Sequence, residues 1–92
     1  MPDTMQRRHI RQPLIEITGS ILATDVDRRG KVLEVVLETD DFRQYIIDQD
    51  PKGKELYNLL YSSVIVRGSV IGKDEHGKQI LKVDSYEIIH HF

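Results

Sequence analysis

Hydrophobic and polar residues alternate over most of the chain, which is the pattern of half-buried β-strands. The first such segment is Leu14–Thr24, in which aliphatic residues of one parity lie on both sides of Gly19. A glycine inside a strand allows the strand to bend sharply, or allows another backbone to approach it closely. We therefore predict a long first strand that bends at Gly19 and serves two sides of a small barrel.

Four later segments are predicted to be strands for the same reason: 31–39, 42–48, 64–71 and 79–89. In the second strand, Leu33, Val35 and Leu37 share one face, and two glutamates share the other face with a valine. The third strand has no clear alternation, and the parity of the last strand changes near Asp84–Ser85, which predicts a bulge. Polar turns are predicted at 25–30, 40–41 and 73–78.

The period of the pattern changes between the third and fourth strands. Asp50–Pro51 combines a good N-cap with proline at the first helical position. Leu56, Leu59 and Leu60 then follow at helical spacing. The pattern predicts a short helix that ends near Ser62 and plugs an opening of the barrel.

The composition fits one small domain, predicted over 14–92 and preceded by a flexible basic arm over 1–13. The chain of 92 residues contains no cysteine, so its 39% hydrophobic residues must supply the stability of the fold. No apolar run reaches the roughly 18 residues of a membrane span. Residues 1–13 also lack the apolar region of a secretory signal. These features predict a cytoplasmic protein that does not bind to a membrane.

The order of three strands, a helix and two strands resembles the OB-fold, a five-stranded Greek-key barrel. The resemblance covers 14–89. It includes Gly19, the helix position and a closing pattern made of Val66, Gly68, Val70, Gly77, Lys78, Val83 and Tyr86. In detail the chain is similar to small stand-alone bacterial OB-fold proteins of uncharacterised function. The implied fold class is mainly β, with one short helix between strands 3 and 4. An SH3-like barrel is the alternative, and it explains the helix less well.

OB-folds bind single-stranded nucleic acid or oligosaccharide on the face of strands 2 and 3, beside the loops that join strands 1–2 and 4–5. The resemblance implies a surface made of 31–48 and the loops 25–31 and 73–78. Cations for phosphates and aromatic rings for bases are the chemistry that this surface needs. The matching residues are Arg28, Arg29, Lys31, Phe42, Arg43, Tyr45, Lys73, His76 and Lys78. We therefore expect weak, salt-dependent binding of single-stranded DNA or RNA.

The charge distribution favours a second class of function. The formal net charge is −2, but residues 32–50 carry six acidic residues against Arg43, a local net charge of −5. Glu34 and Glu38 are predicted on the face where a nucleic acid would lie, and carboxylates beside phosphates weaken binding. An acidic strand face can instead dock a basic protein, and an exposed edge strand can pair with a partner's strand. The alternative function is a protein–protein interaction module.

No motif in the sequence predicts catalysis. The chain has no Gly-rich phosphate loop, no His-Glu helix motif and no Ser/His/Asp set that the fold would gather. Asp25 and Asp27 offer too few oxygen ligands for calcium, which takes about six or more. His90–His91 is an isolated pair near the end of the chain. We therefore expect no enzymatic activity, no metal ion and no cofactor.

Overall fold

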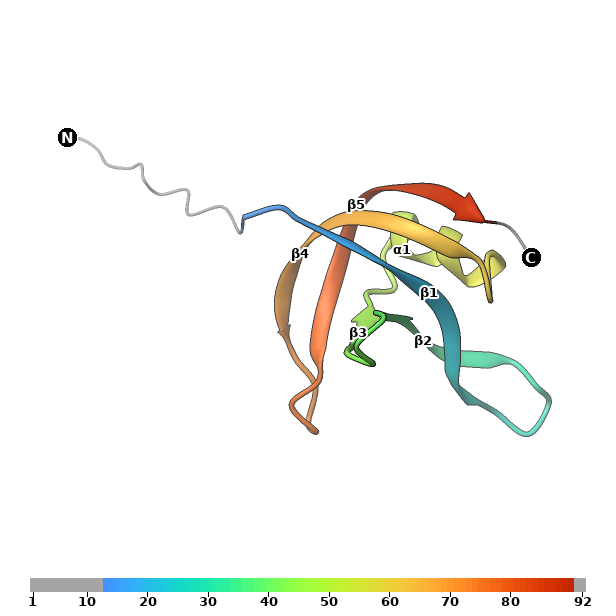
Figure 1. Cartoon of the computed structure of the whole chain (residues 1–92). Coiled ribbons are helices and arrows are strands. Elements are labelled where there is room, and N and C mark those ends of the chain that lie inside the picture. The colour runs from blue at the N-terminus through green and yellow to red at the C-terminus, as the bar shows by residue number, and fades with distance from the viewer. Residues whose placement is uncertain (1–12, 91–92) are drawn as a thin grey trace.

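The computed structural model describes residues 13–90, which form five strands and one short helical segment (Figure 1). The elements are β1 Ile15–Val26, β2 Val32–Glu38, β3 Gln44–Ile47, α1 Pro51–Glu55, the 3-10 helix η1 Leu56–Asn58, β4 Ser63–Lys73 and β5 Gln79–His90. All five predicted strands are present. The predicted arm over 1–13 lies outside the described residues except for its last position.

The strands form a closed barrel in the order β1–β2–β3–β5–β4, and β4 pairs back onto β1. Neighbouring strands are antiparallel except β3 and β5, which run parallel. Closure leaves no complete free edge strand, because each strand pairs on both sides along part of its length. The predicted fold class is confirmed: mainly β, with a five-stranded barrel and one short helix between the third and fourth strands.

β1 changes its partner near its middle. Ile15–Ser20 pair with β4, and Ser20–Val26 pair with β2. Gly19 lies at this change, where an added Cβ would be only 2.4 Å from the carbonyl oxygen of Glu38. The close approach of β2 therefore requires glycine at this position. The prediction of a long first strand that serves two sides of a barrel is confirmed, and Figure 1 shows its curvature.

The predicted bulge in the last strand is also present. Arg67 of β4 pairs with Ser85 of β5, and the next residue, Gly68, pairs with Val83. Asp84 is therefore an extra residue with no partner of its own in the ladder. A bulge of this kind increases the local twist of a strand, which helps a small sheet to close on itself.

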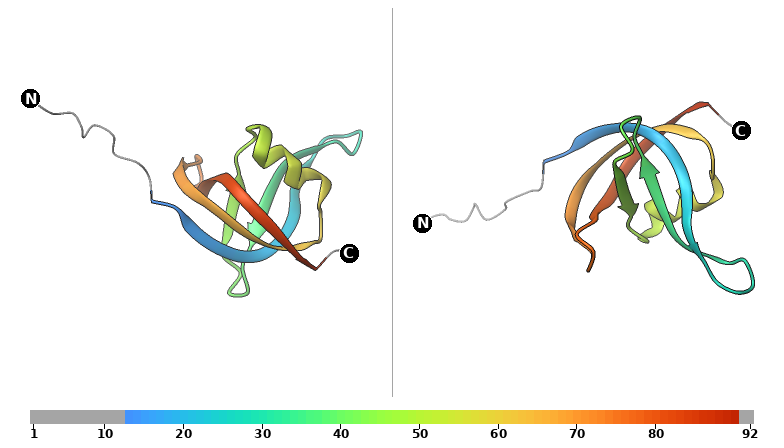
Figure 2. Two further views of the ribbon diagram at one scale, coloured as in Figure 1. Left: turned by 90° about the horizontal axis from the view of Figure 1, so that it is seen from above. Right: turned by 60° about the horizontal axis from the view of Figure 1, so that its bottom comes forward.

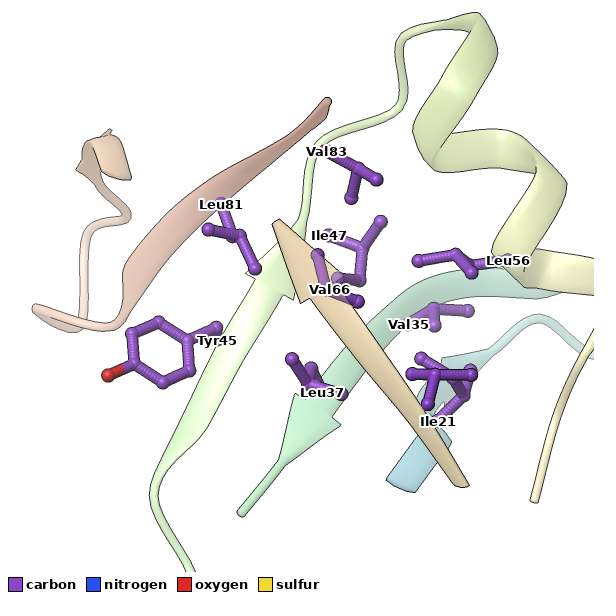
Figure 3. Close-up of a cluster of buried hydrophobic side chains, with 10 residues drawn as sticks. Ile21, Val35, Leu37, Tyr45, Ile47, Leu56, Val66, Leu81 and Val83 are labelled. Carbon is purple, nitrogen blue, oxygen red and sulfur yellow. The ribbon is translucent and has the colours of Figure 1, made fainter. Parts of the chain in front are cut away.

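The barrel interior is filled by side chains from all five strands and from η1 (Figure 3). The buried cluster is Ile21, Val35, Leu37, Tyr45, Ile47, Leu56, Val64, Val66, Leu81 and Val83. Leu56 reaches this cluster from the helical segment, which is the contact expected of a plugging helix. Leu33 shares the parity of Val35 and Leu37 but is 42% exposed, because it lies at the start of β2, outside the buried cluster.

The helical segment begins as predicted and ends earlier. Asp50 caps it by accepting a main-chain N–H at 2.9 Å, and Pro51 is its first residue. α1 then tightens into η1, which ends at Asn58. The predicted end near Ser62 is wrong, because the chain already turns toward β4: Tyr61 has a φ of +70°, and its N–H donates to a carbonyl of β1 at 2.7 Å.

Candidate functional site

The cations predicted to bind a ligand lie in three hairpin loops. The β1–β2 loop carries Arg28, Arg29 and Lys31, the β4–β5 loop and its ends carry Lys73, His76 and Lys78, and the β2–β3 loop carries Arg43. Figures 1 and 2 show the β1–β2 and β4–β5 loops on opposite sides of the barrel. The structure therefore does not gather all of the predicted cations into one cluster.

The β1–β2 and β4–β5 loops have the same construction. Each begins with an aspartate, Asp27 or Asp74, whose carboxylate accepts two main-chain N–H groups at 2.8 or 2.9 Å. A glycine with positive φ follows three residues later, with φ +83° at Gly30 and +81° at Gly77. The next residue is a lysine, whose carbonyl accepts the N–H of the aspartate at 2.9 Å. A turn closed by a left-handed residue is a common hairpin connection.

The β2–β3 loop, residues 39–43, has the same main-chain hydrogen bonds but different side chains. The N–H of Thr39 donates to the carbonyl of Arg43, and the N–H of Phe42 donates to the carbonyl of Thr39, both at 2.9 Å. The Thr39 hydroxyl takes the place of the aspartate and accepts the N–H of Arg43 at 3.2 Å. Phe42 takes the place of the glycine, with a φ of +65° and 81% exposure. Its predicted position in the third strand is wrong, because β3 begins at Gln44.

A row of aliphatic residues crosses the outer surface of four strands. Leu22 of β1 pairs with Val36 of β2, Val36 pairs with Ile46 of β3, and Ile46 pairs with Ile80 of β5. Their immediate neighbours in sequence, such as Leu37, belong to the core, so these four side chains lie on the opposite, outward face. Val36 is fully buried and the other three are half-buried. We call these four residues the aliphatic row. Its three interstrand steps span about 14 Å.

Hydrogen-bonded polar side chains flank the aliphatic row. On the side of the β2–β3 loop, Gln44 donates to Glu38 at 2.8 Å and accepts from Lys78 at 3.2 Å. On the other side, Thr24 donates to Glu34 at 2.6 Å. Both glutamates of the outward face are therefore engaged by neighbouring side chains. Lys78, one of the predicted cations, contacts this face through Gln44.

Tyr45, the aromatic residue predicted to stack on bases, belongs to the buried cluster and is 7% exposed. Its hydroxyl accepts a hydrogen bond from Arg43 at 3.4 Å, and Arg43 also pairs with Asp41 at 3.3 Å (Figure 3 shows the tyrosine). The exposed aromatic side chains of residues 13–90 are Phe42 and Tyr61, and both lie in loops. The outward face around the aliphatic row thus offers no ring for stacking among the described residues.

A pocket of about 290 Å³ lies between the start of β2 and the helical segment. Its lining consists of Lys31, Val32, Leu33, Gln49, Lys54 and Tyr57. The two lysine amines form no ion pair with another residue of the described range. Burial raises the pKa of Tyr57, and the carboxylates of Glu34 and Asp48 lie close enough to raise it further. The pocket thus combines two amines without an ion pair among residues 13–90, a neutral phenol and aliphatic walls, with two carboxylates nearby.

Within residues 13–90, no group of three or more acidic or histidine side chains is arranged to hold a metal ion. The predicted pair His90–His91 extends beyond the described residues. No helix of this part of the chain is long and apolar enough to cross a membrane. No protein-family model, curated protein or solved structure matches the chain.

Two features of the surface were not predicted from the sequence. The aliphatic row depends on the register of four strands, which no single segment contains. The equivalence of the loops did leave a signal, because Asp-x-x-Gly-Lys occurs at both 27–31 and 74–78. The β2–β3 loop shares none of these three residue types at the matching positions, so its likeness to the other loops comes only from the main chain.

Proposed function

We propose that this barrel is an OB-like binding module that holds a protein segment on its outward face. The observation that carries the proposal is the aliphatic row. Leu22, Ile46 and Ile80 keep part of their apolar surface in water, on either side of the buried Val36. A partner that covered the row would remove this surface from water, at about 25 cal/mol per Å².

The dimensions and the chemistry of the face favour a polypeptide over a nucleic acid. A row of about 14 Å matches about four residues of an extended chain or about nine residues of a helix. The row offers aliphatic contacts where a base would need an aromatic ring. The polar residues beside it, Glu38, Gln44 and Lys78, can exchange hydrogen bonds with the polar edge of a docked segment.

The test uses random 12-residue peptides displayed on phage, selected against the protein. Selected peptides are then synthesised and titrated into isotope-labelled protein. We expect aliphatic peptides, NMR shifts at Leu22, Ile46 and Ile80, and an affinity that falls more than about tenfold in Ile46→Glu. The matched control is Ile89→Glu, which charges an exposed isoleucine near the end of β5, whereas Ile80 lies near its start. Equal loss in both variants, or shifts confined to the loops, would contradict the proposal.

A second candidate function, the binding of single-stranded DNA or RNA, is favoured by the β1–β2 loop. Arg28 and Arg29 are exposed and form no ion pair with any residue in 13–90. Lys31 follows them and shares the pocket described above with Lys54. These four cations, which form no ion pair within the described part of the chain, can hold phosphates through long-range attraction, with an affinity that decreases steeply as salt is added.

Fluorescence anisotropy with a labelled 12-nucleotide oligothymidine tests this second function. Arg28→Glu combined with Arg29→Glu should abolish binding at low salt and leave the thermal midpoint nearly unchanged, because both side chains are exposed. The control is Lys73→Glu combined with His76→Glu in the β4–β5 loop. If this control weakens binding as much, the β1–β2 loop is not the specific site. If wild-type protein does not bind the oligonucleotide, the second function fails.

A further inference from the structure

Phe42 is the most exposed large hydrophobic residue of the described chain, and it has an unfavourable backbone conformation. Its side chain is 81% exposed and its φ is +65°. Left-handed backbone is rare for bulky residues, because the Cβ approaches the neighbouring carbonyl oxygen. Glycine avoids this contact, and the matching positions of the other two hairpin loops are Gly30 and Gly77. The same loop is thus built twice with glycine and once with phenylalanine.

Folding does not account for the phenylalanine. A ring that stays mostly in water gains little from burial, so burial does not offset the strained backbone. Strained residues at exposed positions are concentrated at functional sites, where the surrounding structure holds them in place. Here the surrounding hydrogen bonds are those between Thr39 and Arg43, together with the Thr39 hydroxyl, which donates to Asp41. The loop therefore presents the ring on a fixed support.

A ring presented in this way has the properties of an interaction anchor. Aromatic side chains, including phenylalanine, are enriched at protein interfaces, and the residues that dominate binding energy lie in well-packed pockets. A fixed loop loses little conformational entropy on binding, which leaves more of the contact energy as affinity. The β2–β3 loop joins Glu38 to Gln44, so it borders the polar side of the outward face.

The charges around Phe42 define the partner. Asp40 and Asp41 directly precede it, and Arg43, which pairs with Asp41 at 3.3 Å, balances only one of these two negative charges. A polyanion would be repelled by these carboxylates, whereas a cationic surface would be attracted. We propose that Phe42 anchors a protein partner by entering an apolar pocket that lysine or arginine residues surround. This inference rests on the proposed protein-interaction function and names its anchor and the chemistry of the partner.

The test uses the phage-displayed 12-residue peptides and compares four proteins. Phe42→Gly removes the ring and gives the loop the residue that its two equivalents have. Phe42→Gly combined with Gly77→Phe moves the ring to the β4–β5 loop. Tyr61→Ala removes the other exposed aromatic residue with positive φ. We expect wild-type protein to select peptides that combine apolar residues with lysine or arginine, and both glycine variants to bind them more than about tenfold more weakly.

Tyr61→Ala should bind the selected peptides like wild-type protein, because the fold itself uses the Tyr61 conformation: the N–H of Tyr61 donates to the carbonyl of Ile21 in β1 at 2.7 Å. The inference is overturned if no such peptide is selected, if Phe42→Gly binds normally, or if moving the ring restores affinity. It is also overturned if wild-type protein binds labelled oligothymidine and loses that binding in Phe42→Gly, because the ring would then stack on bases. Ile46→Glu separates the two proposals. If only Ile46→Glu loses peptide affinity, the aliphatic row binds the peptide and Phe42 is not its anchor. If only Phe42→Gly loses peptide affinity, Phe42 is the anchor and the row does not contribute.

Discussion

The β2–β3 loop and the β4–β5 loop have the same main-chain hydrogen bonds, but they have different residues at the first and fourth positions. In the β4–β5 loop, Asp74 accepts two N–H groups and Gly77 takes the left-handed position. In the β2–β3 loop, Thr39 accepts with its hydroxyl and Phe42 takes that position. The comparison teaches that the backbone of this hairpin does not depend on one residue type at either position. The side chains are therefore free to differ in their chemistry.

That freedom is used differently in each of the three loops. The two residues at the tip are Arg28–Arg29 in the β1–β2 loop, Asp40–Asp41 in the β2–β3 loop and Glu75–His76 in the β4–β5 loop. One scaffold thus carries a basic, an acidic and a mixed tip. Binding residues commonly lie in loops that a rigid scaffold supports. The basic tip supports the proposed binding of nucleic acid, and the acidic tip lies beside Phe42, the proposed protein anchor.

The largest loss of stability is expected at Gly19 in the barrel wall, where glycine is needed because a side chain has no space. Gly19→Val should destabilise the fold by about 2–4 kcal/mol, because its side chain would meet the Glu38 carbonyl. Gly72→Val is the control, since nothing lies within 4 Å of a Cβ at that position of β4. Thermal unfolding of both variants measures the difference. Equal midpoints would contradict the close approach of β1 and β2.

A smaller effect is expected when the phenylalanine is copied into the β4–β5 loop. Gly77→Phe should cost about 1–2 kcal/mol, because its φ of +81° is unfavourable for any L-residue although the space around it is open. Denaturant titration measures the change in unfolding free energy. The companion Gly77→Ala should lose nearly as much, since the backbone causes the cost. A neutral result for Gly77→Phe would mean that this loop tolerates a bulky residue without strain.

The reverse exchange should stabilise the protein. Phe42→Gly is expected to raise the unfolding free energy by about 1 kcal/mol, which corresponds to about 4–8 °C in the thermal midpoint of a domain of this size. The gain arises because glycine adopts a φ of +65° without the steric cost that phenylalanine has. Calorimetry is the measurement. A lower thermal midpoint in Phe42→Gly would show that the ring contributes to the stability of the fold. Backbone strain would then no longer support a binding role for Phe42.

The architecture could be predicted from the sequence, and most of the surface could not. Gly19 within an alternating segment, together with the Asp50 cap, carries enough local information to place the first strand and the start of the helix. Phe42 was misplaced because an apolar residue after Asp40–Asp41 looks like the start of a strand. The inward position of Tyr45 was also missed, because β3 has only four residues and its alternation is ambiguous. Cross-strand register decides which residues form the aliphatic row, and no local pattern contains it.

The smallest effect on stability is expected from protonation of Asp74, the residue whose carboxylate accepts main-chain N–H groups at the start of the β4–β5 loop. The N–H of Lys78, followed by that of His76, holds the pKa of Asp74 below its usual value near 3.8. Because the folded pKa is lowered, the stabilisation is complete above about pH 4 and is lost as the pH falls through the folded value. The amides of Lys78 and His76 should therefore titrate together in NMR spectra, with a midpoint below 3.8.

Asp74→Asn is the matched control for this titration. It keeps a side-chain oxygen that can accept both N–H groups, but it has no carboxyl to protonate. The loop should therefore remain closed at neutral pH, and the two amides should no longer titrate below pH 4. A midpoint at or above 3.8 in the wild-type protein would mean that the N–H groups do not favour the carboxylate. Asp74 would then resemble Thr39 in supplying an acceptor without a charge effect, and the first position would no longer distinguish the two loops.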